Sequence, residues 1–509
     1  MFPQDLGDKA GWLKLGLWLS LILLLLYGLS TTTADPDLWG YLAFGRLFWE
    51  QGQFPLHDIF AYVPTLKSWV YHEWLTGVIF YPIYQKLGPA GLQALKYLLG
   101  MGAVLLVFLT ARKRGASLLA AGLVLFMVHE FLTYGYSPVR AQVFTYFFFA
   151  LTLYLLENAR LTGRYHGLWL LVFIQVPWCN LHGGFIAGLS VIFLYALGET
   201  LSHRPFWPYL VCLALGGLAT LINPYGLDYW RYLLNAISMP RPEILEWSSV
   251  IVDVKNGTMP LNNAIYLATI IVFTFLLLWW ARWREVTTTL ILGFTLYMGL
   301  NHVRHLVFFL IALGAYLPSL LTPYLETLRT MPRFEGFGRR LGWKIPIIAS
   351  LAVMVLYGYR FLEREPFSLK IYPFPSFESK YVVYYPVGAF DYIREHRLPG
   401  KLLINFRWGE YALWTLHPLC QVAIDGRYET VYPEAVALPY FEFIKGRKDW
   451  RQFLEQYPPD MILIDISSKT CSLLQGEAQW RQVYADTGSA LFVRSPDSRA
   501  ATILWGGVH

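Results

Sequence analysis

Charged residues are scarce in this sequence: Lys, Arg, Asp and Glu supply 15% of its 509 residues, whereas they supply about 25% of a typical soluble domain. Hydrophobic residues make up 56%, and the mean hydropathy is +0.40. This balance excludes an ordinary soluble domain and predicts a helical membrane protein. The net charge of +7 is then expected to reflect basic cytoplasmic loops, with no role in nucleic-acid binding.

Other signals are also missing. We find no internal repeat, and no small-residue cleavage site follows the first apolar run, so this run is expected to remain as a helix. The segment 363–509 has no glycine-rich phosphate loop, metal-ligand quartet or nucleophile elbow. Only four cysteines are present. Cys179 and Cys212 lie in or near apolar runs and are expected to pack there, whereas an oxidising compartment would permit a disulfide between Cys420 and Cys471.

Apolar runs that approach the length of a membrane span, about 20 residues, recur before residue 362. We count eleven of them: 12–30, 89–111, 117–134, 141–157, 167–179, 184–201, 206–222, 263–281, 286–300, 303–322 and 345–361. The stretch 72–88, "HEWLTGVIFYPIYQKLG", is ambiguous between a further span and an amphipathic helix that lies along the membrane surface.

The positions of basic residues decide how this stretch is interpreted. If 72–88 does not span, many Lys and Arg residues fall in short loops on the side of the N-terminus, and if it spans, this bias reverses. These residues are Lys9, Lys14, Arg112, Lys113, Arg114, Arg160, Arg164, Arg204, Arg282, Arg284, Arg329, Arg333, Arg339, Arg340 and Lys344. The positive-inside rule therefore predicts a plasma-membrane protein with eleven spans, a cytoplasmic N-terminus and a long first outer loop at 31–88.

In this topology the unusual polar residues fall on the outer side of the membrane, where any chemistry is expected. They are Asp35, Asp37, His72, Glu73, Arg140, Asn180, His182, Asn223, Glu243, Glu246, His302, Arg304 and His305. The same orientation makes the region after about residue 362 periplasmic or extracellular.

Each of these residues also has a purely structural explanation. Asp35 precedes Pro36 and suits the end of a helix, and Asp37 suits the cap of the amphipathic stretch that follows. "NLHGGF" at 180–185 suits a tight turn that contains His182. Residues 71–74, Arg140 and residues 301–305 suit anchors at the membrane interface.

The functional interpretation takes the polar residues together. The acids Asp35 and Asp37 can act as a general base or hold a divalent cation such as Mg²⁺ or Mn²⁺, and His72 and Glu73 return from the end of the same loop. Arginine binds phosphate oxygens through two donors at once. Acids and arginines at a bilayer edge therefore suit a lipid-linked phosphate substrate. The candidate substrate-binding residues are His72, Glu73, Arg140, His182, Arg304 and His305.

Three features resemble the GT-C superfamily of membrane glycosyltransferases. One span is followed at once by an acidic motif, "ADPDLWGYLAFGRLFWEQGQFP"; the first outer loop ends in "HEWLTGVIFYPIYQKLG"; and a bundle of about a dozen spans precedes an outer domain. The segments "WVYHEWL", "NLHGGF" and "DGRYETVY" also look like those of uncharacterised bacterial members. The resemblance implies a transferase that takes a sugar from a polyprenyl-phosphate-linked donor and acts on the outer face.

The resemblance also implies roles for individual residues. Asp37 matches the loop acid that serves as base or metal ligand, with Asp35 as the alternative, and His72 and Glu73 match positions that contact acceptor or donor. Arg304, or else Arg140, is expected at the donor phosphate. The W-W-D-Y-G signature of oligosaccharyltransferases is absent, which argues against protein N-glycosylation. Transfer to a lipid, glycan or protein acceptor remains, and some branches of the superfamily work without a metal.

The C-terminal segment, 363–509, predicts a small α/β domain beside the membrane domain at 1–362. Short apolar strands are expected at 401–406, 421–425, 461–465 and 489–494, with amphipathic helices between them. Asp425 and Arg427 follow a strand end and suit either contact with the acceptor or a local ion pair in an Asp-Gly turn. Two other functions stay open: a transporter of lipid-linked glycans and a non-catalytic assembly subunit.

Overall fold

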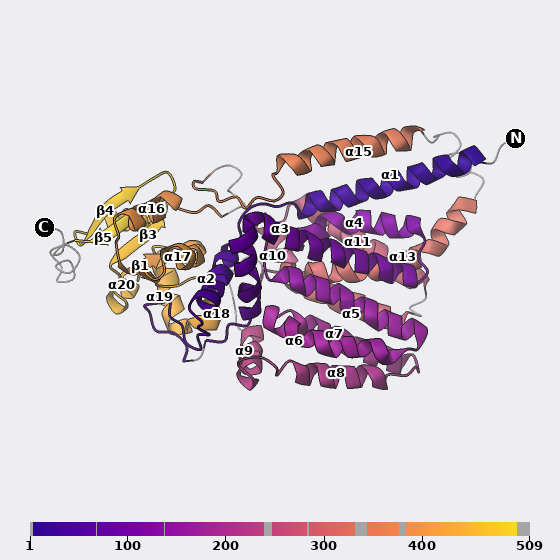
Figure 1. The fold of residues 1–509 in the computed structure, drawn as a ribbon, viewed down its shortest axis with the longest axis horizontal. Helices are drawn as coiled ribbons and strands as arrows, with labels where there is room; N and C mark the ends of the chain where they lie inside the picture. The colour runs from indigo at the N-terminus through magenta and orange to yellow at the C-terminus, as the bar shows by residue number, and fades with distance from the viewer. Residues whose placement is uncertain are drawn as a thin grey trace. The chain divides into compact units, whose positions relative to one another are not determined.

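The computed structural model describes residues 4–67, 69–136, 138–238, 247–281, 285–330, 344–375 and 383–495 (Figure 1). The chain divides into two compact units. Unit 1 comprises Met1–Thr32, Ala90–Gly226 and Ser238–Ser368. Unit 2 comprises Thr33–Pro89, Leu227–Ile237 and Leu369–His509. The expected first outer loop therefore belongs to the same unit as the C-terminal segment.

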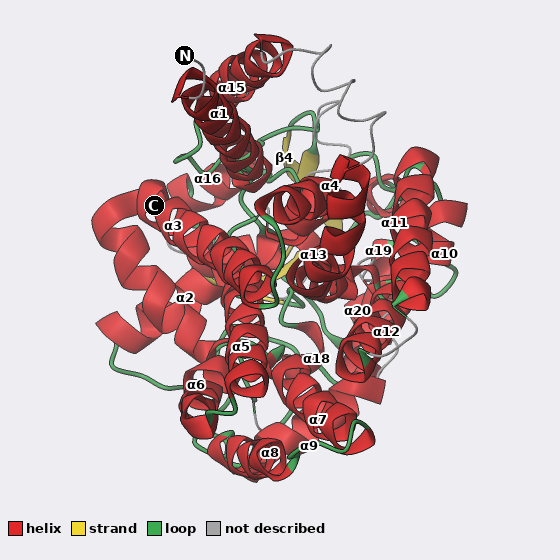
Figure 2. Ribbon diagram, turned by 90° about the vertical axis from the view of Figure 1, so that its right-hand side faces the viewer, coloured by secondary structure: helices red, strands yellow, loops and turns green. Residues whose placement is uncertain are grey.

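Unit 1 is a bundle of apolar helices, which Figure 2 shows nearly end-on. Each of the eleven predicted apolar runs is helical, and among the described residues the short helix α10 (Val250–Lys255) adds a twelfth helix to unit 1. The helices are α1 (Gln4–Leu29), the later part of α3 (Trp74–Lys113), α4 (Leu118–Tyr136), α5 (Gln142–Thr162), α6 (Leu168–Leu181), α7 (Phe185–Leu201), α8 (Trp207–Ala219), α10 (Val250–Lys255), α11 (Leu261–Trp280), α12 (Val286–Asn301), α13 (Leu306–Thr330) and α15 (Lys344–Glu363), with the short 3-10 turns η1 (Tyr165–Gly167) and η3 (Val303–His305).

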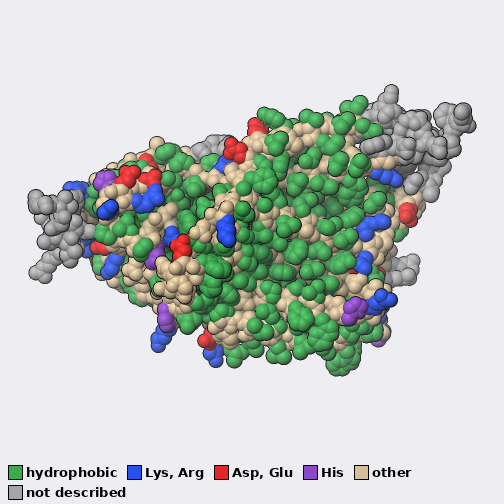
Figure 3. Space-filling model, in the orientation of Figure 1, with side chains coloured by type: hydrophobic (Ala, Val, Ile, Leu, Met, Phe, Trp, Pro, Cys, Tyr) green, Lys and Arg blue, Asp and Glu red, His purple; other side chains and the backbone are tan. Residues whose placement is uncertain are grey.

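Three helical segments among the described residues are long and apolar enough to cross a membrane: Trp74–Lys113, Leu261–Trp280 and Val303–Leu328. Five further apolar helices are shorter, with 10–17 residues each. On the face of unit 1 that Figure 3 shows, hydrophobic side chains cover the helices almost continuously. These features are those of a membrane protein, while the number of eleven spans stays a prediction.

The stretch 72–88 forms a helix of its own. The helix begins at Trp74, and the path of α3 breaks at Gly88, whose φ of 61° and ψ of −156° are open to glycine but strained for other residues. Pro89 then opens the second helical segment. The break lies where the sequence predicts that a surface helix ends and a span begins.

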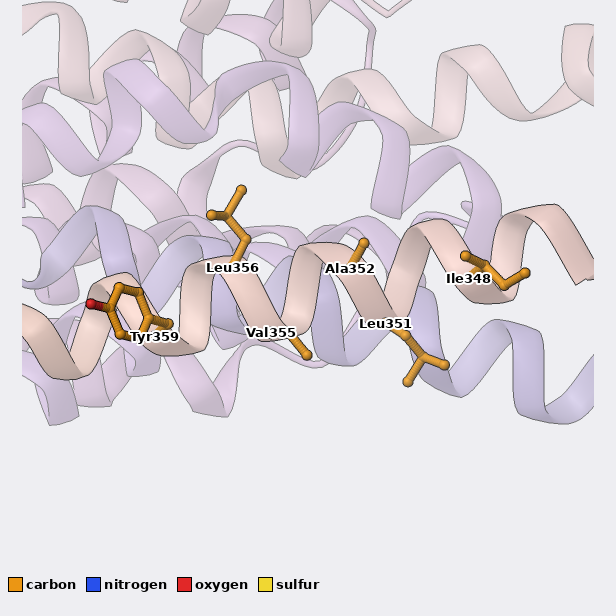
Figure 4. A pocket seen from close by; sticks show the side chains of 6 residues that line it. All are labelled: Ile348, Leu351, Ala352, Val355, Leu356 and Tyr359. Carbon is orange, nitrogen blue, oxygen red and sulfur yellow. The ribbon is translucent and has the colours of Figure 1, made fainter.

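The outer face of α15 carries a shallow apolar groove (Figure 4). The residues that line it are Ile348, Leu351, Ala352, Val355, Leu356 and Tyr359. The opposite side of α15 packs on α1, where the hydroxyls of Ser20 and Ser350 are 2.8 Å apart. The groove holds no charged group that would bind a phosphate, so it is not a candidate active site.

A buried ion cluster joins the ends of α3, α5 and α7 to the start of α12. Arg160 Nε lies 2.9 Å from Glu199 Oε1, and its Nη1 lies 3.2 Å from Glu157 Oε1. Arg114 pairs with Glu157 and with Glu285, the latter at 3.0 Å. The sequence predicts that Arg114 and Arg160 lie in loops. In the structure both side chains are only 6% exposed, and their pairing with acids makes this burial possible.

Unit 2 contains a five-stranded sheet in the order β2-β1-β3-β5-β4. Strand β1 pairs in parallel with β2 and β3, whereas β5 pairs antiparallel with β3 and β4. The strands are β1 (Gly400–Ile404), β2 (Cys420–Val422), β3 (Met461–Asp465), β4 (Trp480–Ala485) and β5 (Ser489–Arg494). The four predicted strands are confirmed. Strand β4 was missed because only Trp480 of its six residues is buried, and Arg481 and Gln482 interrupt the apolar pattern.

Helices complete unit 2. They are α2 (Pro36–Glu50), the first part of α3, α9 (Leu227–Ser238), α16 (Val387–Glu395), α17 (Gly409–Leu416), α18 (Tyr428–Val431), α19 (Glu434–Ile444), α20 (Arg451–Gln456) and α21 (Lys469–Gln475). Among them, α16, α17 and α21 pack on the sheet. Strands alternating with helices confirm the predicted small α/β arrangement.

All four cysteines are buried free thiols. Cys420 lies in β2 and Cys471 lies in α21, so the disulfide that an oxidising compartment would permit is not formed. Burial raises the pKa of the Cys420 thiol to about 12, which makes this thiol unreactive at neutral pH.

The loop after α2 extends the sheet beyond β2. Val422 donates its N–H to the carbonyl of Phe60 at 2.9 Å, and its own carbonyl accepts from Tyr62 N–H at 3.0 Å. These two bonds form a parallel bridge between Ala61 and Val422. The loop thereby covers an edge that would otherwise expose unpaired backbone groups, and it fastens residues 60–62 to the C-terminal segment.

Candidate functional site

The acidic motif forms the start of α2. Asp35 is the N-cap, with extended backbone, and its Oδ1 accepts the N–H of Asp37 at 3.1 Å. Pro36 occupies the first helical position, where its missing N–H costs nothing. Asp37 therefore lies in the first turn and is not the cap that one structural explanation expected. Its carboxylate is half-buried and benefits from the positive end of the helix dipole.

The backbone before this turn is bound by the C-terminal segment of the same unit. Ala34 donates its N–H to the carbonyl of Lys370 at 3.0 Å, and its carbonyl accepts from the Tyr385 hydroxyl at 3.0 Å. Trp39, one turn into α2, is buried edge-on against the rings of Tyr385 and Tyr411. The acidic turn is thus a fixed part of unit 2.

Glu73 and His72, at the end of the loop, lie close to the helix that carries Asp37. The Tyr41 hydroxyl donates to Glu73 Oε2 at 2.9 Å, and Tyr41 is four residues after Asp37, on the same face of α2. His72 Nε2 lies 3.7 Å from Glu73 Oε1, and its ring stacks on Tyr232 of α9. The structure therefore gathers Asp35, Asp37, His72 and Glu73 in one region of unit 2.

Sequence reasoning missed a further carboxyl in this region, that of Glu410. It lies in the first turn of α17, is 4% exposed, and accepts the N–H of Gly40 on its Oε2 at 3.2 Å. Burial, and then the negative charges of Asp37 and Asp425, raise its pKa well above the usual range, although Arg427 opposes this shift. Glu410 belongs to the segment "FRWGEY", which follows a predicted strand end, and this position was the signal in the sequence that could have indicated it.

Asp425 and Arg427 form the local ion pair that was one of the two interpretations. Arg427 Nη2 lies 2.6 Å from Asp425 Oδ2, and Nε lies 2.8 Å from Oδ1. Its Nη1 pairs with Asp58 of the first loop. The guanidinium also lies over the rings of Phe60 and Trp69, at 4.9 and 4.8 Å from their centroids. Both charged side chains are buried in this arrangement, which favours the interpretation as a local ion pair.

The other predicted site residues belong to unit 1. Arg140 lies in the turn before α5, and His182 caps the C-terminus of α6. His182 Nδ1 lies 2.9 Å from the backbone N of Gly184 and 2.9 Å from Thr145 Oγ1. These contacts are those of a turn residue, as the structural explanation of "NLHGGF" expects.

Arg304 and His305 gather around Trp247, a residue that sequence reasoning did not single out. The Arg304 guanidinium lies 4.9 Å from the centre of the Trp247 ring, and the His305 ring meets it edge-on at 5.9 Å. His302 Nδ1 lies 2.8 Å from the Trp247 carbonyl oxygen. Arg304, in the η3 turn that precedes α13, therefore lies against the face of an aromatic ring. Glu243 and Glu246 lie outside the described residues.

Among the described residues, no three His, Cys, Asp or Glu side chains converge closely enough to hold a metal ion. One oxygen of Asp35 is already used by the helix cap. A divalent cation at Asp35 and Asp37 therefore stays a prediction from the sequence.

No protein-family model matches the sequence, and no curated protein matches it. Solved structures do match its fold. The oligosaccharyltransferase AglB from Archaeoglobus fulgidus, in complex with an inhibitory peptide and a dolichol-phosphate, is 12% identical with a TM-score of 0.56 over 96% of this chain and 74% of that one. A second structure of the A. fulgidus oligosaccharyltransferase, tethered to an acceptor peptide, is 12% identical with a TM-score of 0.53 over the same shares.

ArnT from Cupriavidus metallidurans, bound to undecaprenyl phosphate, is 13% identical with a TM-score of 0.51 over 95% of this chain and 98% of that one. The chain has a GT-C fold. The resemblance that the acidic motif, the loop helix and the bundle suggested is thereby confirmed at the level of the fold.

Proposed function

We propose that this chain is a membrane glycosyltransferase that moves a sugar from a polyprenyl-phosphate-linked donor to an acceptor on the outer face of the plasma membrane. One observation carries the proposal: Asp37 and Glu73, from opposite ends of the first loop, are joined through Tyr41 into one carboxylate-bearing region in a GT-C fold. Two partly accessible carboxylates in one region suit proton removal from an acceptor hydroxyl.

The fold supports a lipid-linked donor. The similar structures include AglB with a dolichol-phosphate and ArnT with undecaprenyl phosphate. In this chain, Arg304 is our first choice for the donor phosphate and Arg140 the second, because a guanidinium binds phosphate oxygens through two donors. The six apolar residues on α15 offer no such group.

The reaction we propose is a single displacement. Asp37 accepts the proton of the acceptor hydroxyl as the hydroxyl oxygen attacks the anomeric carbon of the donor sugar. The bond between that carbon and the phosphate oxygen breaks, and the polyprenyl phosphate leaves with the bonding electron pair. Glu73, held by Tyr41, orients the acceptor, and the arginine balances the negative charge on the leaving phosphate.

The proposed orientation has a cytoplasmic N-terminus, eleven spans and an outer C-terminal segment. The face of unit 1 in Figure 3 supports it, since Lys and Arg side chains gather at the end of the helices on which α1 begins. That distribution agrees with the positive-inside rule.

The decisive experiment is mass spectrometry of envelope glycans and glycolipids from the wild type, a deletion strain and an Asp37→Asn strain. We expect both mutants to lose one sugar from the same glycan and to accumulate its polyprenyl-linked donor. Asp391→Asn is the matched control, because Asp391 pairs with Arg394 at the exposed surface of α16. An Asp37→Asn strain with wild-type glycans and normal protein levels would favour the non-catalytic assembly subunit.

A divalent cation is a separate question, which the same assay answers with purified protein. Transfer is measured with EDTA and after addition of Mg²⁺ or Mn²⁺. Activity that survives EDTA agrees with the absence of a three-ligand cluster among the described side chains. Activity that requires the cation would support a metal held at Asp35 and Asp37.

A further inference from the structure

We infer that the C-terminal segment acts in catalysis by holding the Asp37 helix in place, and that Glu410 is the positioning residue through which it does so. This inference rests on the proposed function. It gives the C-terminal segment a role that does not depend on acceptor binding.

Glu410 is wedged between two glycines of unit 2. Its Oε2 accepts the N–H of Gly40 in α2 at 3.2 Å. A Cβ added to Gly40 would lie 2.5 Å from Oε2, and a Cβ added to Gly426 would lie 2.8 Å from Oε1. Heavy atoms do not approach this closely, so a methyl group added at either position would force the Glu410 carboxyl to shift.

The bond to Gly40 acts on the first turns of α2. Gly40 lies three residues after Asp37, which is about one helical turn. On the other side of Asp37, Ala34 is bound by Tyr385 and Lys370. The C-terminal segment thus makes hydrogen bonds to the backbone both before and after Asp37, the proposed base. Because Glu410 is buried, it acts on the reaction through α2 and not by touching substrate.

Burial, and then the charges around Glu410, favour a neutral carboxyl. Asp37, Glu73 and Asp425 all act on it with negative charge, whereas Arg427 is the opposing cation and is itself paired with Asp425 and Asp58. A neutral acid can occupy this position without repelling the base in front of it. A glutamine has the same shape and keeps a carbonyl oxygen for the Gly40 N–H, so it should replace Glu410 with little loss.

The test uses the purified full-length chain and the polyprenyl-linked donor that accumulates in the Asp37→Asn strain. We expect Glu410→Ala to lower kcat at least about tenfold and to change KM less than about threefold, because an ill-placed base slows the chemical step more than binding. We expect Glu410→Gln to stay within about threefold of the wild-type kcat.

A second pair of variants keeps the inference testable if Glu410→Ala folds poorly. Gly40→Ala should lower kcat because the new methyl collides with the Glu410 carboxyl. The double variant Gly40→Ala, Glu410→Ala removes that collision. Its kcat should therefore be at least about threefold higher than the value obtained by multiplying the fold-changes of the two single variants. Gly52→Ala, placed after the end of α2 where nothing lies within 4 Å, gives the effect of an added methyl without a carboxyl to meet, although its φ of +62° adds backbone strain.

The outcomes separate this inference from the function on which it rests. Loss of transfer in Asp37→Asn together with a wild-type kcat in Glu410→Ala, or with strictly multiplicative effects of the Gly40 and Glu410 substitutions, would overturn the inference and leave the function standing. Transfer that is absent even from the wild-type chain would overturn the proposed function itself.

Discussion

The hydroxyl of Tyr41 donates a hydrogen bond to Oε2 of Glu73, with 2.9 Å between the two oxygens. This bond joins the helix at the start of the first loop to the residue at its end. It brings Glu73 to the helix that carries Asp37, an acid 36 positions earlier in the sequence. The relationship between Tyr41 and Glu73 is therefore open to a direct test.

Tyr41→Phe should lower the rate of sugar transfer about fivefold, because it removes one partly exposed hydrogen bond of about 1 kcal/mol that orients Glu73. The measurement is kcat of the purified chain at saturating donor. Tyr84→Phe is the control, since the Tyr84 ring packs on Trp414 in the same unit. A wild-type kcat in Tyr41→Phe would mean that the orientation of Glu73 is unimportant.

The buried cluster around Arg427 makes a prediction about stability. Arg427→Met leaves the buried carboxylates of Asp425 and Asp58 without their cation, which should destabilise the fold by about 3–5 kcal/mol. The check is thermal unfolding in detergent, with Arg447→Met as control, because the Arg447–Glu442 pair is exposed and is worth about 0–1 kcal/mol.

A triple variant with Asp58→Asn, Asp425→Asn and Arg427→Met removes the charges together and should recover part of the loss. Equal melting temperatures for Arg427→Met and Arg447→Met would contradict the structural role of the cluster.

Glu410 gives the stability of the chain a predictable dependence on pH. Its pKa is raised in the folded chain, so the folded state holds a proton that the unfolded state releases above about pH 4.5. Below that pH, Glu410 is protonated in both states and does not lower the stability of the fold. As the pH rises from there toward the pKa of Glu410 in the folded chain, the free energy of unfolding falls. Glu410→Gln removes this term.

Glu410→Gln should therefore gain stability over the wild type as the pH rises from about 4.5 to 8, while the two should melt closer together at the acidic end. Thermal unfolding across this pH range is the measurement, and Glu395→Gln on the exposed end of α16 is the control. A difference between Glu410→Gln and the wild type that stays constant with pH would show that Glu410 is ionised in the folded chain.

The sequence predicts the helices well and the strands nearly as well, because both depend on local apolar patterns. It also places Asp35, Asp37, His72 and Glu73 in one loop, and the structure brings them together. It does not predict the contact between Gly40 and Glu410, which are 370 positions apart, because no local pattern records which glycine makes room for which carboxyl.

The sequence also does not predict the electrostatic environment of individual charged side chains. Arg114 and Arg160 look like any basic loop residues in sequence, yet each is buried against acids from other helices. In sequence, Asp425 and Arg427 suit either contact with an acceptor or a local ion pair. The structure favours the buried ion pair, because Asp58 of the first loop pairs with the same guanidinium. Such long-range pairings determine burial, and burial determines what a charged side chain can do.

The ion cluster of unit 1 leads to a further prediction. Arg160→Leu should destabilise the chain by about 3–5 kcal/mol, because it leaves Glu199 and Glu157 buried with less compensation. Arg160→Lys should recover only part of this, since an ammonium cannot reproduce the forked contacts of a guanidinium. Thermal unfolding in detergent measures both, and the exposed Arg164→Leu is the control. A melting temperature for Arg160→Leu equal to that of Arg164→Leu would contradict the cluster's role.

The proposed topology can be tested with single cysteines, because the four native thiols are buried and should give little background. Lys448 is exposed in unit 2 and Arg164 is exposed between α5 and α6. A membrane-impermeant maleimide applied to intact cells, or to spheroplasts where an outer membrane is present, should label Lys448→Cys at once.

Arg164→Cys should react only after the plasma membrane is permeabilised, because the positive-inside rule places its loop in the cytoplasm. Detergent-solubilised protein is the control, in which both cysteines should react fully. Labelling of Arg164→Cys before permeabilisation, with protection of Lys448→Cys, would invert the topology and place the Asp37 region on the cytoplasmic side, where the donor would have to present its sugar to a different set of acceptors.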